Sequence, residues 1–499
     1  MDNLTIGFLT HTITYLLQVA TLELTINNTP NLTFLDLSRN KFVSKIPSSL
    51  GSLLHLTSLD LSNNSFFGEI PFSFGNLSNL ISLNLFDNNF EGKLPSSLGN
   101  LSYLKFLDLS VNNIVGEIPS SLGNLSHLSF FYLHFNNFSG NIPSSLGNIS
   151  HLTSLTLSFN YFVGEIPSSL GNLSYLKNLI LSHNSFVGEI PPSFGSLSHL
   201  AFLDVESNNL SGSFPLELLN LTKLSILFLS NNRFSGNLPS SFNNTLDFSN
   251  TSPSSKLREL YIDNNNFIGP IPITIFQSVS LVRVHLGNNH LSGKLSEIFF
   301  NGSNLRSLHL GHNQLVGKLP RSLSSCSSLE RNFLKGKPFR TDIGDRSYDQ
   351  DSLALMNKGL KMNGHIPSSL ANLTTLESLD LSNNKLSGQI PPSLGDLTSL
   401  SNITVSHNQL VGPIPQSRQF QTQDASSFED NMGLCGRPLS ITCGDIDTEI
   451  TEEPETEEEE EEEKAVLSWT AAVIGLAPGV IFGLIIGTIV TLQKPQWLM

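Results

Sequence analysis

The sequence predicts an α/β repeat fold, a solenoid made by stacking one short unit many times. A tract with the pattern Leu-x-Leu-x-x-Asn recurs every 24 residues from Leu35 to Leu227 and resumes from Leu260 onward. Most copies are followed by a Gly-x-Ile/Leu-Pro step. A fixed period of this length indicates one supersecondary unit per repeat.

Alternation inside each tract predicts a short strand with one buried face. In Leu35-Asp36-Leu37 the leucines lie on one side of the strand and the aspartate lies on the other. One unit cannot bury its apolar face alone, so neighbouring units stack and share a continuous core. The Asn that ends each tract, such as Asn112, can both donate to and accept from backbone groups where the chain leaves the strand. We expect these amides to form a buried ladder.

The complete unit reads Leu-x-x-Leu-x-Leu-x-x-Asn-x-Phe/Leu-x-Gly-x-Ile/Leu-Pro-x-x-Leu-Gly-Asn-Leu. This is the pattern of a leucine-rich repeat, and its Gly-x-Ile/Leu-Pro step resembles the plant-specific class. Glycine supplies a tight turn there, and proline fixes the φ angle that follows. The resemblance implies a plant-type superhelical solenoid with a second short strand in each turn.

Breaks in the period predict the domain organisation. Residues 1–30 form a degenerate segment without the basic region of a signal peptide, so we expect an N-terminally truncated chain. The other expected segments are repeats at 31–330, a non-repeat island at 331–361, repeats at 362–416, a cap at 417–444, an acidic juxtamembrane segment at 445–465, a transmembrane helix at 466–492 and a short cytoplasmic tail at 493–499.

The charge distribution argues against nucleic acid as a partner. The formal net charge is −15, but the stretch from Asp445 to Glu463 contributes −13 of it. The repeats are therefore close to neutral and lack the excess of Lys and Arg side chains that binding to a phosphate backbone needs. We expect no enzyme activity, cofactor or metal, because no catalytic set, phosphate loop or Cys/His cluster stands out from the repeat.

Sequons and cysteines predict an extracellular compartment. Many Asn-x-Ser/Thr tripeptides occur, although several of them are part of the repeat pattern itself, as at Asn100 and Asn124. Cys435 and Cys443 follow the last repeat, and a disulfide between them is the natural expectation in an oxidising compartment. Cys326 falls on a framework position and is expected to be a buried apolar side chain.

The segment 466–492 has no charged residue and lies between Lys464 and Lys494. As a helix it would be about 40 Å long, enough to cross a hydrocarbon core of about 30 Å with tilt. The preceding glutamates are unsuited to the anionic cytoplasmic leaflet, so we expect a single-pass type I plasma-membrane protein with extracellular repeats. A stripe of small residues suits helix association: Gly475, Gly479, Gly483 and Gly487.

These features together resemble the kinase-less plant leucine-rich-repeat receptor-like proteins of the Cf type. The resemblance rests on Tyr348-Asp349-Gln350-Asp351, on Gly433-Leu434-Cys435-Gly436, and on the acidic, membrane and tail segments up to Trp497. The family's N-terminal cysteine cap is absent. The resemblance implies a receptor in plant defence, whose membrane helix binds an adaptor receptor kinase and whose ligand recruits a leucine-rich-repeat co-receptor kinase. By this analogy, co-receptor contacts fall on Asp380, Asn383, Thr404 and His407.

Three other functions stay open at this point. They are a clavata-like developmental peptide receptor, a leucine-rich-repeat inhibitor of cell-wall hydrolases, and a non-functional truncated gene product. The uninterrupted membrane span argues against the secreted inhibitor.

An extracellular peptide, protein or glycan ligand is expected on the outward strand residues, because fold stability does not dictate their identity. Two groups depart from the usual Ser, Asp and Asn, and the alternative for both is drift on a tolerant surface. The first, the aromatic group, comprises Phe130, Tyr132, His134, Phe135, Phe159, Ile180 and His183. The second, the histidine–arginine group, comprises Arg258, Tyr261, Arg283, His285, Arg306, His309 and His312.

Overall fold

The computed structural model describes residues 3–5, 31–240, 257–276, 280–295, 307–319, 361–373, 376, 378–382 and 384–443. They all belong to one compact unit, residues 1–443, and the second unit covers residues 444–499. No helix among the described residues is both long and apolar enough to span a bilayer. Several expectations lie outside the described residues: island residues 331–360, the acidic, membrane and tail segments with Gly475, Gly479, Gly483 and Gly487, and Arg306, Cys326 and Asn383.

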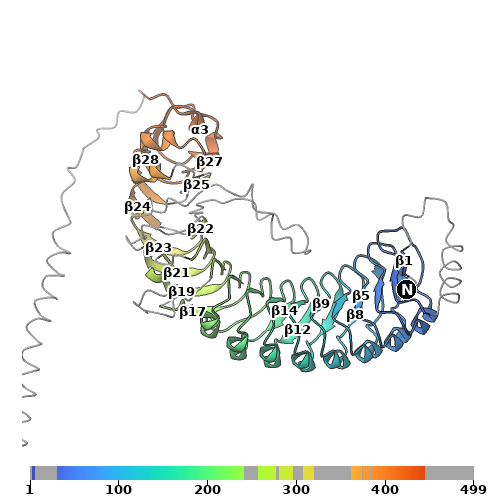
Figure 1. Ribbon diagram of the computed structural model, residues 1–499. Helices are drawn as coiled ribbons and strands as arrows, with labels where there is room; N and C mark the ends of the chain where they lie inside the picture. The colour runs from blue at the N-terminus through green and yellow to red at the C-terminus, as the bar shows by residue number, and fades with distance from the viewer. Residues whose placement is uncertain are drawn as a thin grey trace, which may run out of the picture. The chain divides into compact units, whose positions relative to one another are not determined.

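The first strand of each repeat pairs in parallel with its counterpart in the next repeat, and equivalent leucines such as Leu35 and Leu59 are register partners. The described repeats follow one another along a curved solenoid, with these strands on its concave side (Figure 1). The main sheet contains β1 (Asn3–Thr5), β2 (Phe34–Asp36), β3 (Ser58–Asp60), β5 (Ser82–Asn84), β7 (Phe106–Asp108), β9 (Phe130–Tyr132), β11 (Ser154–Thr156), β13 (Asn178–Ile180), β15 (Phe202–Asp204), β16 (Ile226–Phe228), β18 (Glu259–Tyr261), β20 (Arg283–His285) and β22 (Ser307–His309), and β25 (Ser378–Asp380) pairs separately with β27 (Asn402–Thr404).

Most repeats carry a second short strand, as the plant-type resemblance implies. β23 (Gln314–Gly317) pairs directly with β24 (Lys361–His365), so the second strands before and after the interval 320–360 are neighbours in one sheet. The three parallel sheets are β4 (Phe67–Gly68) with β6 (Asn89–Phe90); β8 (Val115–Gly116), β10 (Asn137–Gly140), β12 (Tyr161–Glu165) and β14 (Ser185–Val187); and β17 (Ser235–Asn237), β19 (Asn266–Pro270), β21 (His290–Lys294), β23 (Gln314–Gly317), β24 (Lys361–His365), β26 (Lys385–Gly388), β28 (Gln409–Pro413) and β29 (Gly433–Cys435).

The helical part of the repeat is a 3₁₀ turn after the proline. Five residues are too few for a stable α-helix, and i→i+3 bonds such as Leu101 N–H to the Leu98 carbonyl (3.2 Å) close the turn instead. Neighbouring turns pack so closely that a Cβ on Gly99 would clash with the Ser121 carbonyl. These turns are η1 (Ser48–Ser52), η2 (Phe72–Asn76), η3 (Ser96–Asn100), η4 (Ser120–Asn124), η5 (Ser144–Asn148), η6 (Ser168–Asn172), η7 (Pro192–Ser196), η8 (Leu216–Asn220), η10 (Ser368–Asn372) and η11 (Pro392–Asp396), with α2 at Ile273–Phe276.

The core consists of columns of identical side chains running through the stack. Leu107 and Leu109 are fully buried. A phenylalanine column follows the second strands, where Phe138 and Phe162 have ring centroids 6.0 Å apart and planes 6° apart. Each column is apolar on every side, because the next repeat supplies the surface that one repeat lacks.

The expected amide ladder is confirmed. Asn112 is 8% exposed, and its Nδ2 donates to the Leu85 carbonyl (3.0 Å) and the Leu109 carbonyl (3.2 Å). Its Oδ1 accepts the Phe90 N–H at 2.9 Å. One amide therefore satisfies backbone groups of two repeats where the chain turns out of the strand.

Wherever the structure describes it, the residue before a ladder asparagine has a left-handed backbone. Val111 has φ 56° there, whereas Asn63, Asn231 and Asn264 fill the same position of other repeats. A β-branched residue is strained in this conformation and asparagine tolerates it. We expect Val111→Asn to raise the free energy of unfolding by about 1 kcal/mol, measured by urea denaturation. A lower stability would show that packing of the valine outweighs the strain.

A short cap closes the C-terminal end of the stack. It contains α3 (Arg418–Gln421), η12 (Ala425–Ser427) and the terminal strand β29. Phe420 and Phe428 are fully buried, and the Asn431 amide continues the ladder by donating to the Val405 carbonyl at 3.0 Å. Cys435 and Cys443 are joined by a disulfide. The cap thus covers apolar surface that the last repeat would otherwise expose.

Candidate functional site

The aromatic group lies on the concave side around β9. Phe130 is 42% exposed, and its ring lies 6.2 Å from that of Phe106 in the preceding strand β7. The Phe135, Phe159 and His183 rings stack at 4.2 and 4.1 Å. All three have left-handed backbones, and they project from successive repeats as one stack.

Two members of the aromatic group are buried. Ile180 is 4% exposed and lies in register with Thr156 and Asp204 on its neighbouring strands. His134 is also 4% exposed, and neither of its ring nitrogens has a hydrogen-bond partner. These two side chains are therefore not surface residues in this structure, unlike Phe130.

Burial without a partner lowers the pKa of His134 to about 4 from its ordinary 6.5. The folded state therefore keeps this imidazole neutral while the unfolded chain protonates it below pH 6.5. The contribution of the neutral His134 imidazole to the free energy of unfolding is fully present above pH 6.5. It is lost as the pH falls towards 4.

We expect His134→Ser to remove about 3 kcal/mol of acid-induced destabilisation between pH 7.5 and 4. Serine fits, because Ser110 and Ser158 fill this position in the adjacent repeats. The measurement is the urea midpoint of the wild type and the variant across this pH range. His55→Ser, at an exposed histidine, should leave the pH profile unchanged. Parallel profiles for wild type and His134→Ser would contradict the expectation.

The histidine–arginine group is only partly brought together. Tyr261, His285 and His309 end the successive strands β18, β20 and β22 and face one another. The Tyr261 and His285 rings lie 4.4 Å apart, and the His285 and His309 rings stack at 3.7 Å. Arg283 instead forms an ion pair with Glu259 at 2.8 Å. Arg258 is exposed and His312 half-buried, and neither lines the pocket described next.

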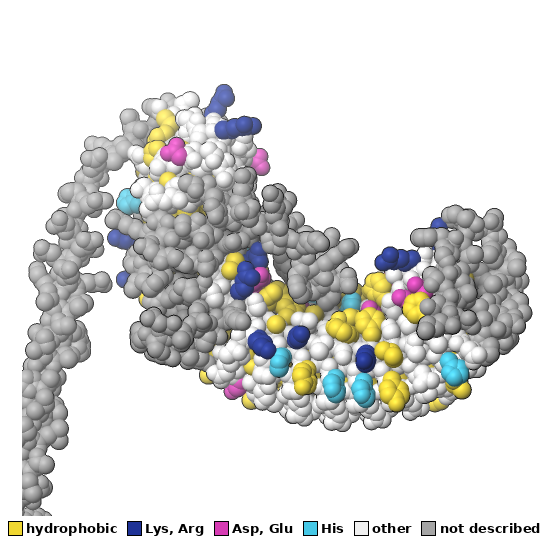
Figure 2. All heavy atoms as spheres, viewed as in Figure 1, with side chains coloured by type: hydrophobic (Ala, Val, Ile, Leu, Met, Phe, Trp, Pro, Cys, Tyr) yellow, Lys and Arg dark blue, Asp and Glu magenta, His cyan; other side chains and the backbone are white. Residues whose placement is uncertain are grey.

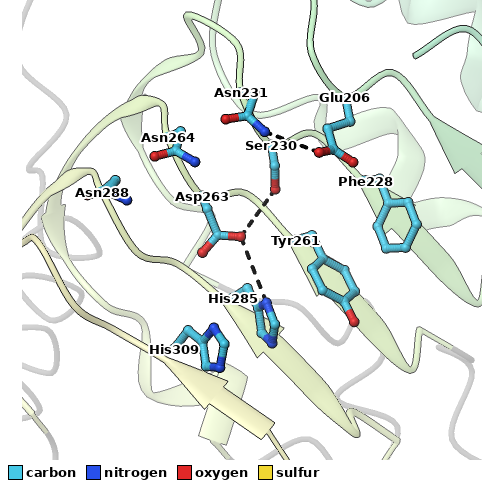
Figure 3. A pocket seen from close by; sticks show the side chains of 10 residues that line it. All are labelled: Glu206, Phe228, Ser230, Asn231, Tyr261, Asp263, Asn264, His285, Asn288 and His309. Carbon is cyan, nitrogen blue, oxygen red and sulfur yellow. Dashed lines mark hydrogen bonds and ion pairs between the residues drawn. The ribbon is translucent and has the colours of Figure 1, made fainter. Parts of the chain in front are cut away.

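A pocket of about 240 Å³ opens beside these rings. One wall is the row of strand-end rings that begins with Phe228, and the opposite side carries carboxylates and amides (Figure 3). The lining residues are Glu206, Phe228, Ser230, Asn231, Tyr261, Asp263, Asn264, His285, Asn288 and His309.

Asp263 is the central polar group of this pocket. Its Oδ1 accepts the Gly287 N–H at 2.9 Å. Its Oδ2 accepts the Ser230 hydroxyl at 3.2 Å (Figure 3). Burial raises the pKa of its carboxyl to about 7, although the bonds from Gly287 and Ser230 oppose the shift. The carboxylate therefore titrates near neutral pH.

The two histidines do not neutralise Asp263. Burial, with smaller effects from His309 and Arg283, lowers the pKa of His285 to about 2. Burial lowers the pKa of His309 to about 4. The His285 Nδ1 is 4.0 Å from Asp263 Oδ2, so this contact joins a neutral ring to the carboxyl. The pocket consequently presents aromatic faces next to an acidic group.

Glu206 and Asp263 were missed at the level of sequence. Both occupy the position after the second strand leucine, where most repeats have serine, as at Ser182 and Ser230. The departure from serine was a visible signal, and it identified His134 in the same column. Within the described ranges, no cluster of His, Cys, Asp and Glu side chains has an arrangement suited to a metal ion.

The proposed co-receptor residues lie near the C-terminal end of the repeats. Asp380 and Thr404 are register partners on β25 and β27. His407 pairs with Asp430 of the cap, Nδ1 to Oδ2, at 2.7 Å. This exposed pair joins the last repeat to the cap.

Comparison with known proteins agrees with this architecture. The family model described as Leucine Rich Repeat matches residues 31–53, 55–77, 79–101, 103–125, 127–149, 151–173, 175–197, 223–245, 256–278, 304–326 and 375–397, about half of the chain. The chain belongs to the leucine-rich-repeat family. It is similar over short stretches to plant receptor-like proteins of Arabidopsis thaliana.

Receptor-like protein 33 is 48% identical over 81 residues, 16% of this chain and 9% of that protein. Receptor like protein 22 is 51% identical over 75 residues, 15% of this chain and 9% of that protein. The matched segments thus span less than a tenth of the length of either relative.

Two solved structures of plant receptors share the solenoid. One is the ectodomain of the Arabidopsis thaliana membrane receptor kinase GASSHO1/SCHENGEN3 in complex with CASPARIAN STRIP INTEGRITY FACTOR 2, with 35% identity and TM-score 0.73 over 84% of this chain and 46% of that chain. The other is the plant peptide hormone receptor RGFR1 in complex with RGF2, with 30% identity and TM-score 0.69 over 82% of this chain and 64% of that chain.

Proposed function

We propose that this leucine-rich-repeat chain is the ligand-binding part of a plant cell-surface receptor-like protein and that its ligand is an extended peptide with a basic residue. The observation that carries the peptide proposal is the concave pocket, in which Asp263 lies beside the Tyr261, His285 and His309 rings. A guanidinium or ammonium group would gain a carboxylate partner and aromatic faces there. The similarity to a peptide hormone receptor solved with RGF2 supports the same ligand class.

The rest of the peptide would lie across the strands towards the aromatic group. From β9 to β20 the main sheet contains six strand-to-strand steps, about 29 Å at ~4.8 Å per step. An extended chain covers that distance in about nine residues. Phe130 and the Phe135–Phe159 stack supply apolar contacts at one end of this path, and the Asp263 pocket supplies the acidic contact at the other.

The experiment compares two pools of random ten-residue peptides, one containing a fixed arginine and the other norleucine in its place. We expect the full-length chain to bind the arginine pool at least about tenfold more tightly, and Asp263→Asn to abolish the difference. Asp87→Asn is the matched control, because Asp87 is exposed in another repeat. Equal binding of both pools by the wild type would exclude the basic anchor.

We further propose that residues 466–492 anchor the receptor in the plasma membrane and that it acts in plant defence through partner kinases. The glycine stripe supports helix association with an adaptor receptor kinase, and Asp380, Thr404 and His407 are candidates for contact with a co-receptor kinase. Gly479→Leu with Gly483→Leu should abolish co-purification of a receptor kinase from plant membranes. Val480→Leu, beside the stripe, is the control, and equal kinase recovery from both variants would exclude this mode of association.

A further inference from the structure

A row of exposed aromatic and imidazole side chains runs along the outer edge of the repeats, where hydrophobic and histidine side chains follow one another (Figure 2). Tyr103 is 58% exposed and Tyr175 is 54% exposed. Each member of this Tyr/His row stands directly before a buried leucine of its repeat, at 24-residue intervals. The row comprises Tyr103, His127, His151, Tyr175 and His199.

Three rings at the centre of the Tyr/His row are nearly parallel. Tyr103 is tilted by 35° to His127, and His199 by 26° to Tyr175. None of these rings covers its neighbour. His127 and His151 have centroids 5.9 Å apart and planes 4° apart, and His151 and Tyr175 have values of 6.2 Å and 1°. Directly stacked rings elsewhere in the molecule, Phe135 and Phe159, are 4.2 Å apart. Each ring of the row therefore keeps open surface for another group.

Hydrogen bonds fix the orientation of the histidines. The Nδ1 of His127 is 2.9 Å from the Ser102 carbonyl, and His151 and His199 make the equivalent contact. Because a carbonyl only accepts, Nδ1 carries the proton and Nε2 is left as an acceptor in the neutral ring. Asn79, at the equivalent position of an earlier repeat, makes a similar bond to the Leu54 carbonyl. A hydrogen bond to the preceding repeat therefore does not by itself require an aromatic or imidazole ring at this position.

A glycosylation sequon precedes four members of the row by three residues. Asn100, Asn124, Asn148 and Asn172 each begin an Asn-x-Ser tripeptide and are exposed. In the first of these repeats, Leu101 and Leu104 are fully buried and are joined by a turn bond of 2.9 Å. Asn100 and Tyr103 consequently both lie on the solvent side of the same turn.

We propose that the Tyr/His row is a binding surface for the protein's own Asn-linked glycans. The apolar C–H face of a pyranose ring stacks on an aromatic ring, and its hydroxyl and acetamido groups bond to phenol and imidazole atoms. The row offers one such platform beside each of the four sequons. This inference is independent of the peptide pocket, because the row lies outside the strand face.

The test is the rate at which a peptide N-glycosidase releases glycans from the native full-length chain produced in the plant secretory pathway. Release converts the asparagine to aspartate, so mass spectrometry reads each site separately. We expect Tyr103→Ala with Tyr175→Ala to accelerate release at Asn100 and Asn172 by about threefold to tenfold, the range expected for loss of one aromatic contact. The glycan at Asn76 is an internal control, because Asn79 stands three residues after it.

Two further variants separate stacking from folding. Tyr103→Phe with Tyr175→Phe keeps the ring faces and should retain slow release. Tyr161→Ala removes a tyrosine that is 64% exposed on β12 and should change neither site. Equal release from wild type and the double alanine variant would overturn the proposal, as would empty Asn100 and Asn172. Binding of free cellohexaose to the glycosylated wild type, lost in the double alanine variant, would assign the row to an external glycan instead.

Discussion

Asn112→Ala is expected to lower the free energy of unfolding by about 4 kcal/mol. The substitution removes the acceptor of the buried Phe90 N–H and the donor to the Leu85 carbonyl. Both groups belong to the preceding repeat, so the loss acts on the contact between repeats as well as on one turn. Alanine cannot replace either bond, and the buried backbone groups stay unsatisfied.

The measurement is urea denaturation combined with hydrogen exchange, because a stack of repeats can open locally. Exchange should accelerate at Phe90 and at residues of β7. Asn113→Ala is the matched control, since Asn113 is the adjacent residue and is exposed, and its effect should stay within about 0.5 kcal/mol. Similar losses for the two variants would contradict a structural role specific to the ladder amide.

Binding of the arginine peptide pool is expected to weaken about tenfold between pH 8 and pH 6. The pKa of Asp263, raised to about 7 by burial, makes its carboxyl mostly charged at pH 8 and mostly neutral at pH 6. A cationic ligand favours the charged form, so affinity rises with pH. His285 and His309, whose pKa values burial lowers to about 2 and about 4, stay neutral across this range.

Asp263→Asn should flatten this pH dependence, measured as the dissociation constant by fluorescence anisotropy at fixed ionic strength. The norleucine pool provides the control, because its binding does not depend on the charge of Asp263. A wild-type affinity for the arginine pool that stays constant or falls as the pH rises would contradict the assignment of Asp263 as the partner of the basic residue.

The sequence predicted part of the candidate site. Tyr261, His285 and His309 were identified because they replace small polar residues on the outward strand face. The acidic half, Glu206 and Asp263, was missed, although both residues replace serine at the repeat position that His134 also occupies. Its importance depends on the rings placed across from it, which only the assembled repeats show.

The solenoid of the described repeats followed from the sequence alone. The leucine positions, the Asn112 type of ladder and the proline-led turns recur in nearly identical surroundings, so one local pattern decides the structure of each repeat. Only the tertiary structure decided which outward residues are accessible. His134 and Ile180 belong to outward positions but are buried, because their exposure depends on the size and tilt of side chains in neighbouring repeats. Those neighbours are 24 or more residues away in sequence, and the local pattern does not encode how they pack.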